Sequence, residues 1–524
     1  MPDTVVLGGG IIGLSTAYYL AKLTRDAGVQ HNIHIVEPSS QLFSSASGKA
    51  GGFLAKDWFN PTMAPLGELS FRLHKELAEQ NDGRAKWGYA PVISYSLDRY
   101  ASSHGDSDSE SNRDTDSEPP VSPLSEQRSL EGETRDETQR NGHATGQVNE
   151  TEVPPRHNQN RSSAGEDWME AGESRVVAVE QRLAEASERP VGAGAEEQAA
   201  AALALANADA EAAALAEENA ATAKLDDPLW LRAKPHALQA ISDKTTTAQC
   251  NPQQLCEFLL NSCLAMGVRL HHPALATHLY HADSNDPASQ TMLKLTNISK
   301  TGVGRTIRTA SYELPVDSLV VAAGCWTPDA FRTLFPDAPR PPTIDRHAGY
   351  SVRVRSRHWQ PAPPSAPAPY AGPCHAVFTS DPSGFSPELF TRVASELWIG
   401  GVNDSQLPLT DDPTDTLPDP DAIERMLAVG RELCGDDIEV IDASVCFRPV
   451  TPTRKPFITR VDEKALGAGV VPQAQAGAGV PGGVYVAAGH GPWGISMSLG
   501  TGLVVAEMVL GRETSADVKS LGKW

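Results

Sequence analysis

The sequence predicts an α/β protein in which a nucleotide-binding domain, made of separated segments, holds an inserted domain with a mixed or antiparallel β-sheet. Three observations predict this fold class. A glycine turn lies between an apolar run and a helical pattern near residue 8, strands alternate with helices at both ends of the chain, and the middle is richer in strands and prolines. A long acidic stretch of low hydrophobicity interrupts the pattern.

The glycine turn is the first element. Residues 7–22 read LGGGIIGLSTAYYLAK and follow an apolar run that starts at Val5. Gly8 lets the chain turn, Gly10 lets the backbone approach a pyrophosphate, and Gly13 lets the helix pack close to the strand. A chain with 43 glycines can produce this spacing by chance. Its place between a strand and a helix favours a dinucleotide-binding turn over a turn that only connects core elements.

A second apolar run, HNIHIVE, ends at Glu37, which lies 24 residues after Gly13. An acidic residue near this distance binds the ribose diol of a dinucleotide. An arginine in its place would favour a 2′-phosphate, so the sequence disfavours NADP.

Residues 101–226 are rich in Ser, Glu, Gln, Asn and Gly and poor in aromatic and β-branched residues. They carry 27 acidic and 10 basic residues, which is −17 of the total charge of −22. Such a segment cannot bury enough apolar surface to offset the entropy lost on ordering. We expect a disordered or partly helical acidic insertion, and a segment that binds a protein partner is the alternative.

The remaining chain is mildly acidic and has no basic footprint for nucleic acid. No apolar run approaches the roughly 18 residues that a membrane span needs. Seven cysteines without a CxxC pair or a zinc-type spacing indicate a reduced compartment. The predicted fold starts within a few residues of Met1, and the final residues are not an S-K-L type signal, so we expect a cytoplasmic location by elimination.

Further elements follow the insertion. Asn251-Pro252 opens a helical pattern that ends at Gly267. Residues 316–326, VDSLVVAAGCW, predict a buried parallel-type strand, and GYSVRVR, ELWIGGV and GVYVAAG predict more strands. The last of these leads into HGPWG and a closing helix from about Ile495 to Leu510.

Several landmarks occur in an order that resembles the D-amino-acid oxidase (DAO) superfamily of FAD-dependent oxidoreductases, which includes glycine oxidase and sarcosine oxidase. They are VVLGGGIIGLSTAYYLA, SSASGKAGGFL, CNPQQLCEFLL, DSLVVAAGCW, ELWIGG, CFRPVTPTRKPFI and YVAAGHGPWGISMSLGTGLVVAEM. The resemblance covers the chain except residues 101–226, and SGKAGGFLAKDW looks most like a fungal subgroup. It implies a Rossmann-like FAD-binding domain in segments 1–100, 227–335 and 446–524, the first of which runs into the substrate domain, with an inserted mixed or antiparallel β-sheet substrate domain over 336–445.

The resemblance also implies how the chain would bind FAD. The glycine turn would hold the pyrophosphate and Glu37 the adenosine ribose, while the loop from Ser44 to Gly52 would pass the pyrophosphate and the isoalloxazine ring. The closing turn would cover the flavin and direct helix N–H groups at its electron-rich edge. The residues assigned to FAD are Gly8, Gly10, Ile11, Ile12, Gly13, Glu37, Ser45, Ser47, Gly48, Lys49, Ala50, Gly51, Gly52, Ala276 (by the adenine), Gly324 and Trp326 (at the cofactor's middle), Gly489, His490, Gly491, Trp493, Gly494 and Ile495.

Three residues are candidates for the chemistry. Arg448, in CFRPVTP, would pair with a substrate carboxylate, and an arginine that holds a loop by an ion pair is the alternative. Lys49 is a candidate for a cation that assists flavin reoxidation, and His490 is a candidate in the closing turn. The family's usual acidic-Gly pair is replaced here by Thr453-Arg454, so the resemblance specifies the cofactor better than the substrate.

Cys446 lies just before the T-P element, where sarcosine-oxidase relatives carry a cysteine that is joined covalently to the flavin. A small buried thiol at the end of a strand is the alternative.

The implied reaction moves a hydride from the carbon next to the nitrogen of an amino acid or secondary amine to flavin N5, and water hydrolyses the imine that results. A second nicotinamide-binding GxGxxG domain is absent from the sequence, so we expect reoxidation by O2 or by another acceptor. A flavin-bearing protein with an interaction or trafficking role, in which the acidic insertion binds a partner, is the competing hypothesis.

Overall fold

The computed structural model describes residues 1–98, 228–232, 238–286, 288–360, 373–380, 385–474, 477 and 479–524. The acidic insertion expected over residues 101–226 lies outside these described residues.

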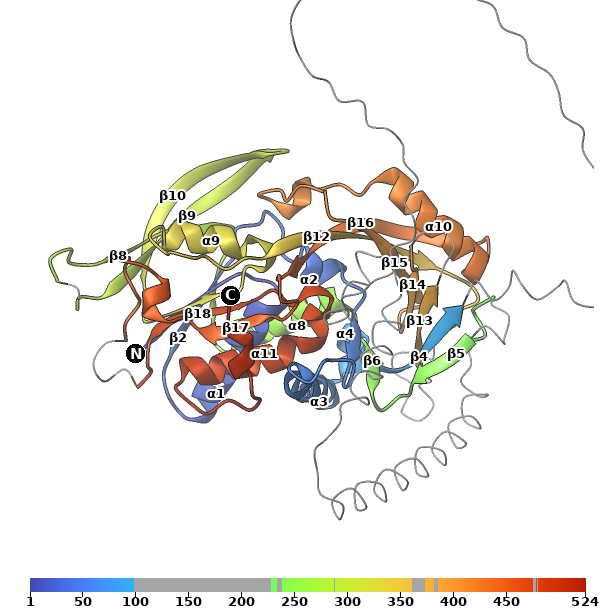
Figure 1. The fold of residues 1–524 in the computed structure, drawn as a ribbon, viewed down its shortest axis with the longest axis horizontal. Helices are drawn as coiled ribbons and strands as arrows, with labels where there is room; N and C mark the ends of the chain where they lie inside the picture. Colours follow the sequence, from blue (N-terminus) through green and yellow to red (C-terminus); the bar gives the residue numbers. More distant parts are fainter. Residues whose placement is uncertain are drawn as a thin grey trace, which may run out of the picture.

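A six-stranded, mostly parallel sheet carries the N-terminal glycine turn (Figure 1). β1 lies between β11 and β2, so the turn that follows β1 emerges near the middle of the carboxyl edge of the sheet. β17 pairs antiparallel with β18, and the other strands run parallel. In spatial order the strands are β17 (Phe457–Arg460), β18 (Gly483–Ala488), β11 (Ser318–Val321), β1 (Asp3–Leu7), β2 (Asn32–Val36) and β7 (Arg269–His271).

Three helices pack on one face of this sheet: α1 (Ile11–Asp26), α8 (Pro252–Ala265) and α11 (Gly494–Val509). The crossing of α1 and α11 is very close, because a Cβ atom added at Gly502 would lie 2.4 Å from the backbone carbonyl carbon of Ser15. α11 is buried along nearly its whole length, which explains its apolar composition. The closing helix expected from about Ile495 to Leu510 is confirmed.

The other face of the sheet is covered by a three-stranded antiparallel sheet, which the sequence analysis did not predict. It consists of β8 (Ala274–His281), β9 (Thr291–Gly302) and β10 (Arg305–Pro315), with α9 (Thr327–Leu334) beside β8. Half of the β9–β10 hairpin projects beyond the core (Figure 1) and its side chains are mostly exposed, so its sequence carries only a weak strand pattern.

The inserted domain is built on a nine-stranded, largely antiparallel sheet, which confirms the expected mixed or antiparallel architecture. Only the pairing of β13 with β4 is parallel among its described strand pairs. α10 (Pro420–Cys434) packs on β12 and β15. The strands are, in order, β16 (Glu439–Val450), β12 (Asp345–Arg355), β15 (Glu396–Asp404), β14 (Glu388–Arg392), β13 (Cys374–Ser380), β4 (Ala90–Asp98), β6 (Thr247–Gln249) and β3 (Phe53–Ala55), with β5 (Leu238–Ser242) paired to β4.

β16 runs unbroken from Glu439 to Val450, so the domain boundary expected between 445 and 446 falls inside one strand. Cys446 and Arg448 therefore lie on the antiparallel sheet, while the turn that contains His490 lies at the end of β18. An isolated antiparallel bridge between Val450 and His490 joins the two sheets at this point.

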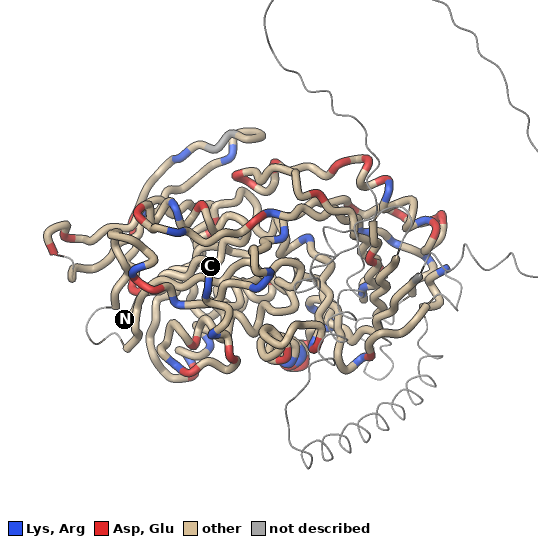
Figure 2. Tube along the Cα trace, viewed as in Figure 1, with Lys and Arg blue, Asp and Glu red and all other residues tan. Residues whose placement is uncertain are grey.

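The surface of the described chain carries both signs of charge, and Figure 2 shows lysine and arginine interspersed with aspartate and glutamate over both halves. All seven cysteines are buried free thiols. Within the described ranges, no helix has the length and apolar character needed to cross a membrane, and no cluster of ligating side chains is arranged to hold a metal ion.

Candidate functional site

The glycine turn is shaped by two positions that require glycine. Gly8 has a φ of +113°, and a Cβ atom there would lie 2.4 Å from the carbonyl oxygen of Ala322 at the end of β11. A Cβ atom at Gly13 would lie 2.0 Å from the carbonyl oxygen of Gly8. The first glycine therefore fits the turn against the neighbouring strand, and Gly13 lets α1 approach the turn.

The start of α1 offers free backbone donors. Gly10 is the N-cap and provides no side-chain cap, so the N–H groups of the first turn point out of the helix with its positive dipole end. The hydroxyl oxygen of Ser47 accepts a hydrogen bond of 2.9 Å from Ile11 N–H. The loop around Ser47 thus closes over the helix start, where a phosphate group would be bound.

Glu37 lies at the turn, as its spacing predicted. Its Oε2 accepts a hydrogen bond from Gly9 N–H at 2.7 Å, and its Oε1 accepts one from Ser39 N–H at 2.8 Å. Each carboxylate oxygen keeps a second lone pair, so the carboxylate can accept further hydrogen bonds from a ribose diol.

Two further glycine turns border open space. Gly324, in the 3-10 helix η3 (Gly324–Trp326), and Gly491, in η6 (Gly491–Trp493), both have a φ of +55°. A Cβ atom at either position would meet no heavy atom within 4 Å. Both turns follow strands that run parallel to β1, so they lie at the same edge of the sheet as the start of α1, and we call these three segments the cofactor cradle.

The loop after α2 (Ala46–Lys49) is held by side chains of the antiparallel sheet. Trp398 Nε1 donates to the carbonyl of Lys49 at 3.2 Å. Arg392 Nη2 donates to the carbonyls of Ala50 and Gly51 at 3.1 and 3.0 Å. Every carbonyl from 49 to 51 thus has a partner on the sheet.

Gln249 adds another donor, because its Nε2 lies 2.5 Å from the Gly51 carbonyl oxygen. Gly51 also packs on an aromatic ring, since a Cβ atom there would lie 2.6 Å from Cε2 of Phe390. The Phe390 ring is stacked on Trp398 with centroids 5.2 Å apart. The sequence analysis missed Gln249, Arg392 and Trp398, which are about 200 to 350 residues from the loop and belong to no glycine-type motif.

Arg448 lies near the end of β16, two residues before the Val450–His490 bridge. Its Nη1 donates to Asn403 Oδ1 at 2.6 Å, and its guanidinium lies over Gly349, where a Cβ atom would approach it to 2.4 Å. Among the described residues, no carboxylate forms an ion pair with Arg448. This favours a free fork of donors over the alternative of an arginine held by an ion pair.

His347 is the cross-strand partner of Arg448 and was not predicted. Burial, together with the charges of Arg448 and Arg454, lowers the pKa of His347 to about 4, so the ring is neutral at physiological pH. Its Nε2 is buried and has no hydrogen-bond partner. Asn403 and His347 are separated from Arg448 in the sequence and approach it only through strand pairing.

The comparisons with known proteins agree with this geometry. The profile of the DAO family, described as FAD dependent oxidoreductase, matches residues 3–138 and 130–508. The chain belongs to this family. A provisionally named oxidoreductase of Schizosaccharomyces pombe is 43% identical over 98 residues, which is 18% of this chain and 25% of that protein. Another from Saccharomyces cerevisiae is 44% identical over 94 residues, or 18% and 17% of the two chains. These alignments span a quarter or less of the relatives' lengths.

Solved structures of DAO-type enzymes share the fold over nearly the whole chain. Glycine oxidase from Geobacillus kaustophilus has a TM-score of 0.56 and 17% identity, and iminodiacetate oxidase from Chelativorans sp. BNC1 has 0.54 and 16%. Each alignment covers 99% of this chain and 98% of the other. L-proline dehydrogenase from P. horikoshii has a TM-score of 0.55 and 14% identity, and the alignment covers 99% of this chain and 96% of the dehydrogenase. At such identities the likeness shows the fold alone.

The other residues that the DAO resemblance singled out are placed less favourably for chemistry. His490 is buried, its Nε2 lies 3.1 Å from Thr501 Oγ1, and burial lowers its pKa to about 3. The neutral ring therefore holds the closing turn against α11. The Trp326 indole donates to the carbonyl of Thr410 at 2.9 Å, so it supports a segment of the inserted domain. Ala276 lies at an irregularity in β8, which is close to β2.

Lys49 and Cys446 lie near each other, between α2 and β16. Lys49 Nζ donates to the carbonyl of Val445 at 3.4 Å, and burial lowers the pKa of Lys49 despite Cys446 and Asp442 nearby. Burial raises the pKa of Cys446, while Arg448 and Lys49 oppose this. A covalent bond from Cys446 to the flavin stays a prediction.

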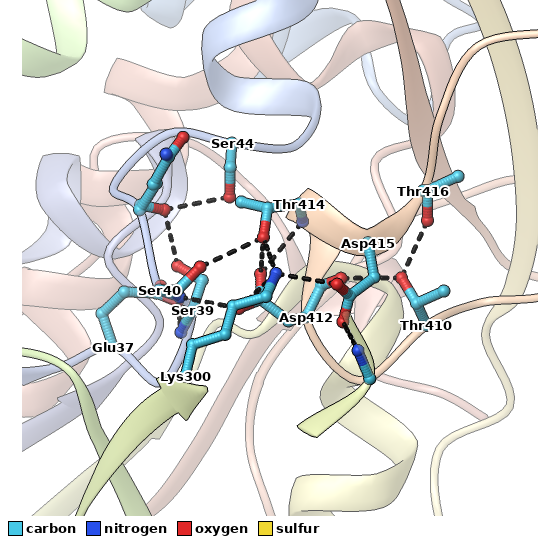
Figure 3. Close-up of polar contacts among 12 residues, drawn as sticks. Glu37, Ser39, Ser40, Ser44, Lys300, Thr410, Asp412, Thr414, Asp415 and Thr416 are labelled. Atoms are coloured by element: carbon cyan, nitrogen blue, oxygen red, sulfur yellow. Dashed lines mark hydrogen bonds and ion pairs between the residues drawn. The ribbon is translucent and has the colours of Figure 1, made fainter. Parts of the chain in front are cut away.

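A polar junction ties three distant segments together beside Glu37 (Figure 3). Lys300, from the β9–β10 hairpin, lies 2.8 Å from Asp415, 3.5 Å from Asp412 and in contact with Thr414. Asp412 in turn accepts a hydrogen bond of 3.1 Å from Ser40 N–H. This Lys300 junction, formed by Ser40, Lys300, Asp412, Thr414 and Asp415, was missed because its members share no motif.

Proposed function

We propose that this DAO-family chain binds FAD and oxidises the C–N bond of an amino acid or secondary amine. Glycine turns at Gly8, Gly324 and Gly491, with Glu37 at the first of them, support FAD binding. Arg448 is the observation that favours a substrate with a carboxylate. It forms no ion pair with a described carboxylate and lies next to the closing turn.

The position of Arg448 explains how the chain would orient such a substrate. A guanidinium offers a planar fork of donors that binds a carboxylate in one orientation. Asn403 occupies Nη1 and fixes the plane of the fork. The neutral His347 beside it adds no charge, so the positive charge at this point comes from arginines.

Bound FAD supplies the hydride acceptor. The substrate loses a hydride from the carbon next to nitrogen and a proton from the nitrogen, and water then hydrolyses the imine to a carbonyl compound and an amine. The two electrons leave to O2 or to another acceptor. In this proposal the chain contributes orientation of the substrate rather than a dedicated base.

An anaerobic reduction assay tests the proposal. The full-length protein should purify yellow with one FAD per chain, and its visible flavin absorbance should bleach when the right amine is added without oxygen. Matched pairs, such as N-methylglycine with dimethylamine and glycine with methylamine, separate the need for a carboxylate from the need for an amine.

Four outcomes distinguish the alternatives. Bleaching only by the carboxylate-bearing member of a pair supports an amino-acid substrate. Equal bleaching by both members supports an amine oxidoreductase without a carboxylate anchor. A yellow protein that no amine bleaches contradicts the reaction and leaves the interaction role, whereas a colourless protein whose melting temperature FAD does not raise contradicts the cofactor.

A further inference from the structure

A cavity lies between α2 and the antiparallel sheet. Its volume is about 430 Å³. It is enclosed by residues 41–44 and α2, by the start of α8, by residues 414–418 and by the antiparallel sheet. Ser47 of α2 contacts the glycine turn, whereas Gly48 and Lys49 line this cavity. Glu37 and Arg448 do not line it, whereas Ser44, Gly48 and Lys49 of the loop expected beside the flavin do, so the cavity adjoins the expected cofactor site and is separate from Arg448.

The cavity wall contains a buried arginine without an acidic partner. Arg392 is 5% exposed, its Nη2 donates only to two backbone carbonyls, and its Nε has no partner. The nearby carboxylates of Glu396 and Asp442 lie 3.3 and 2.8 Å from Arg353 instead. Burial lowers the pKa of Arg392 only to about 10, because the charges of Glu396 and Asp442 oppose it without an ion pair, so a buried positive charge remains at neutral pH.

The charges around the cavity favour an anion. Lys49, Arg353 and Arg392 line it, against the single carboxylate of Asp442. Asp442 is already bound by Arg353 through two hydrogen bonds of 2.9 and 2.8 Å. The charges of Lys49 and Arg392 are therefore left without a paired carboxylate in the cavity wall.

The start of α8 adds to this field. Asn251 is the N-cap of this 14-residue helix, and Asn251 and Gln253 both line the cavity. The positive end of the helix dipole lies there, where it stabilises a negative charge. The start of α8 and the buried guanidinium of Arg392 are therefore two independent sources of positive potential at the cavity.

We propose that this cavity binds a small carboxylate, separate from the substrate bound at Arg448. A planar guanidinium binds a carboxylate through two parallel hydrogen bonds, and Lys49 supplies a further charge across the cavity. The volume is in the range of small-molecule sites and admits a ligand of a few carbon atoms. Ser351 and Ser444 in the sheet provide hydroxyl groups for its remaining polar atoms.

Binding at this site would be communicated to the cofactor loop. Arg392 holds the carbonyls of Ala50 and Gly51, so a ligand that draws its guanidinium changes the loop expected beside the flavin. The effect would be regulatory, because the ligand would act through the backbone of the loop and not at the reacting atoms.

The test is calorimetric titration of the full-length protein with malonate at constant ionic strength. Malonate should bind saturably, and binding should persist in Arg448→Leu, which removes the substrate anchor. In the Arg448→Leu background, Arg392→Met and Lys49→Met should each weaken binding at least about tenfold. The matched control is Lys75→Met, which removes an exposed cation on α3 (Ala64–Asn81) and should change nothing.

Several results would overturn the proposal. They are the lack of saturable binding by the wild type, loss of binding in Arg448→Leu, unchanged affinity in Arg392→Met or Lys49→Met, and tighter binding of inorganic phosphate than of malonate. If Arg392→Met does not give folded protein, the affinity for malonate is measured in Arg392→Lys and Lys49→Met instead. Lys49→Met leaves the buried guanidinium in place, and both variants should bind malonate more weakly. Calorimetry detects binding without turnover, so an inactive protein that binds malonate would contradict only the proposed reaction.

Discussion

The carboxylate of Glu37 lies 2.7 Å from the backbone nitrogen of Gly9 and accepts its hydrogen bond. This contact joins the end of β2 to the glycine turn, so the side chain fixes the turn and, in the proposed function, would also present acceptors to the ribose of FAD. A charged hydrogen bond of this kind contributes about 1.5–3 kcal/mol.

Glu37→Gln should therefore weaken FAD binding about tenfold to a hundredfold, because the amide loses the charge and one of two acceptor oxygens. The measurement is a titration of the apoprotein with FAD, followed by flavin fluorescence. Glu68→Gln, at an exposed glutamate that pairs with Lys56, is the control and should bind FAD normally. An unchanged affinity in Glu37→Gln would show that the carboxylate serves the turn alone.

Arg448→Leu should lower kcat/KM for a carboxylate-bearing substrate at least about tenfold, because the charge-assisted pair is lost. Arg448→Lys should restore little, since it keeps the charge but loses the fork. Turnover of an amine without a carboxylate is the control and should change much less. Equal losses for both substrates, or loss of FAD, would assign Arg448 to structure.

Lys300→Met should loosen the Lys300 junction and with it the segment that follows Glu37. Asp412 and Asp415 are only 10% and 9% exposed, so removal of the cation leaves two carboxylates poorly compensated. Burial alone would raise the pKa of Asp412, yet hydrogen bonds from Ser40 and Thr414 outweigh it and lower that pKa.

We expect a loss of about 1–3 kcal/mol in stability and faster release of FAD, measured by thermal unfolding and by dilution of the holoprotein. Lys294→Met removes an exposed lysine from the same strand and is the matched control. Loss of stability in both variants to the same extent would mean that the junction has no special role.

His490 should make the protein sensitive to acid. Burial lowers the pKa of His490 to about 3, whereas a histidine in the unfolded chain titrates near pH ~6.5. The unfolded state therefore binds a proton first as the pH falls. The contribution of neutral His490 to the free energy of unfolding is complete above about pH 6.5 and is lost progressively as the pH falls toward about pH 3.

At about pH 5, protonation of His490 in the unfolded chain lowers the free energy of unfolding by about 2 kcal/mol relative to neutral pH. His490→Asn should reduce the fall in Tm between about pH 7.5 and about pH 5, even if its Tm at the higher pH is lower than that of the wild type. The buried His74 and His347 have lowered pKa values too, so part of the fall should remain. His278→Asn, at an exposed position on β8, should leave the fall unchanged.

The sequence by itself determined the glycine turn, the place of Glu37 beside it, the strand before this turn (β1) and the strand before α11 (β18). These features were predicted because strand, turn and helix follow each other locally, and the glycines have a backbone reason for their residue type. Gly8 and Gly13 show this directly, since a side chain at either would collide with a neighbouring carbonyl.

Only the tertiary structure decided which residues surround the expected flavin loop and the substrate anchor. Arg392, Trp398 and His347 look like ordinary strand residues, and each reaches its partner through sheet pairing or the packing of one sheet on a distant loop. Such pairing depends on register over hundreds of residues, where a shift by one residue would turn every side chain to the other face. Local sequence patterns do not show which distant strands pair with each other, so the fold had to supply these contacts.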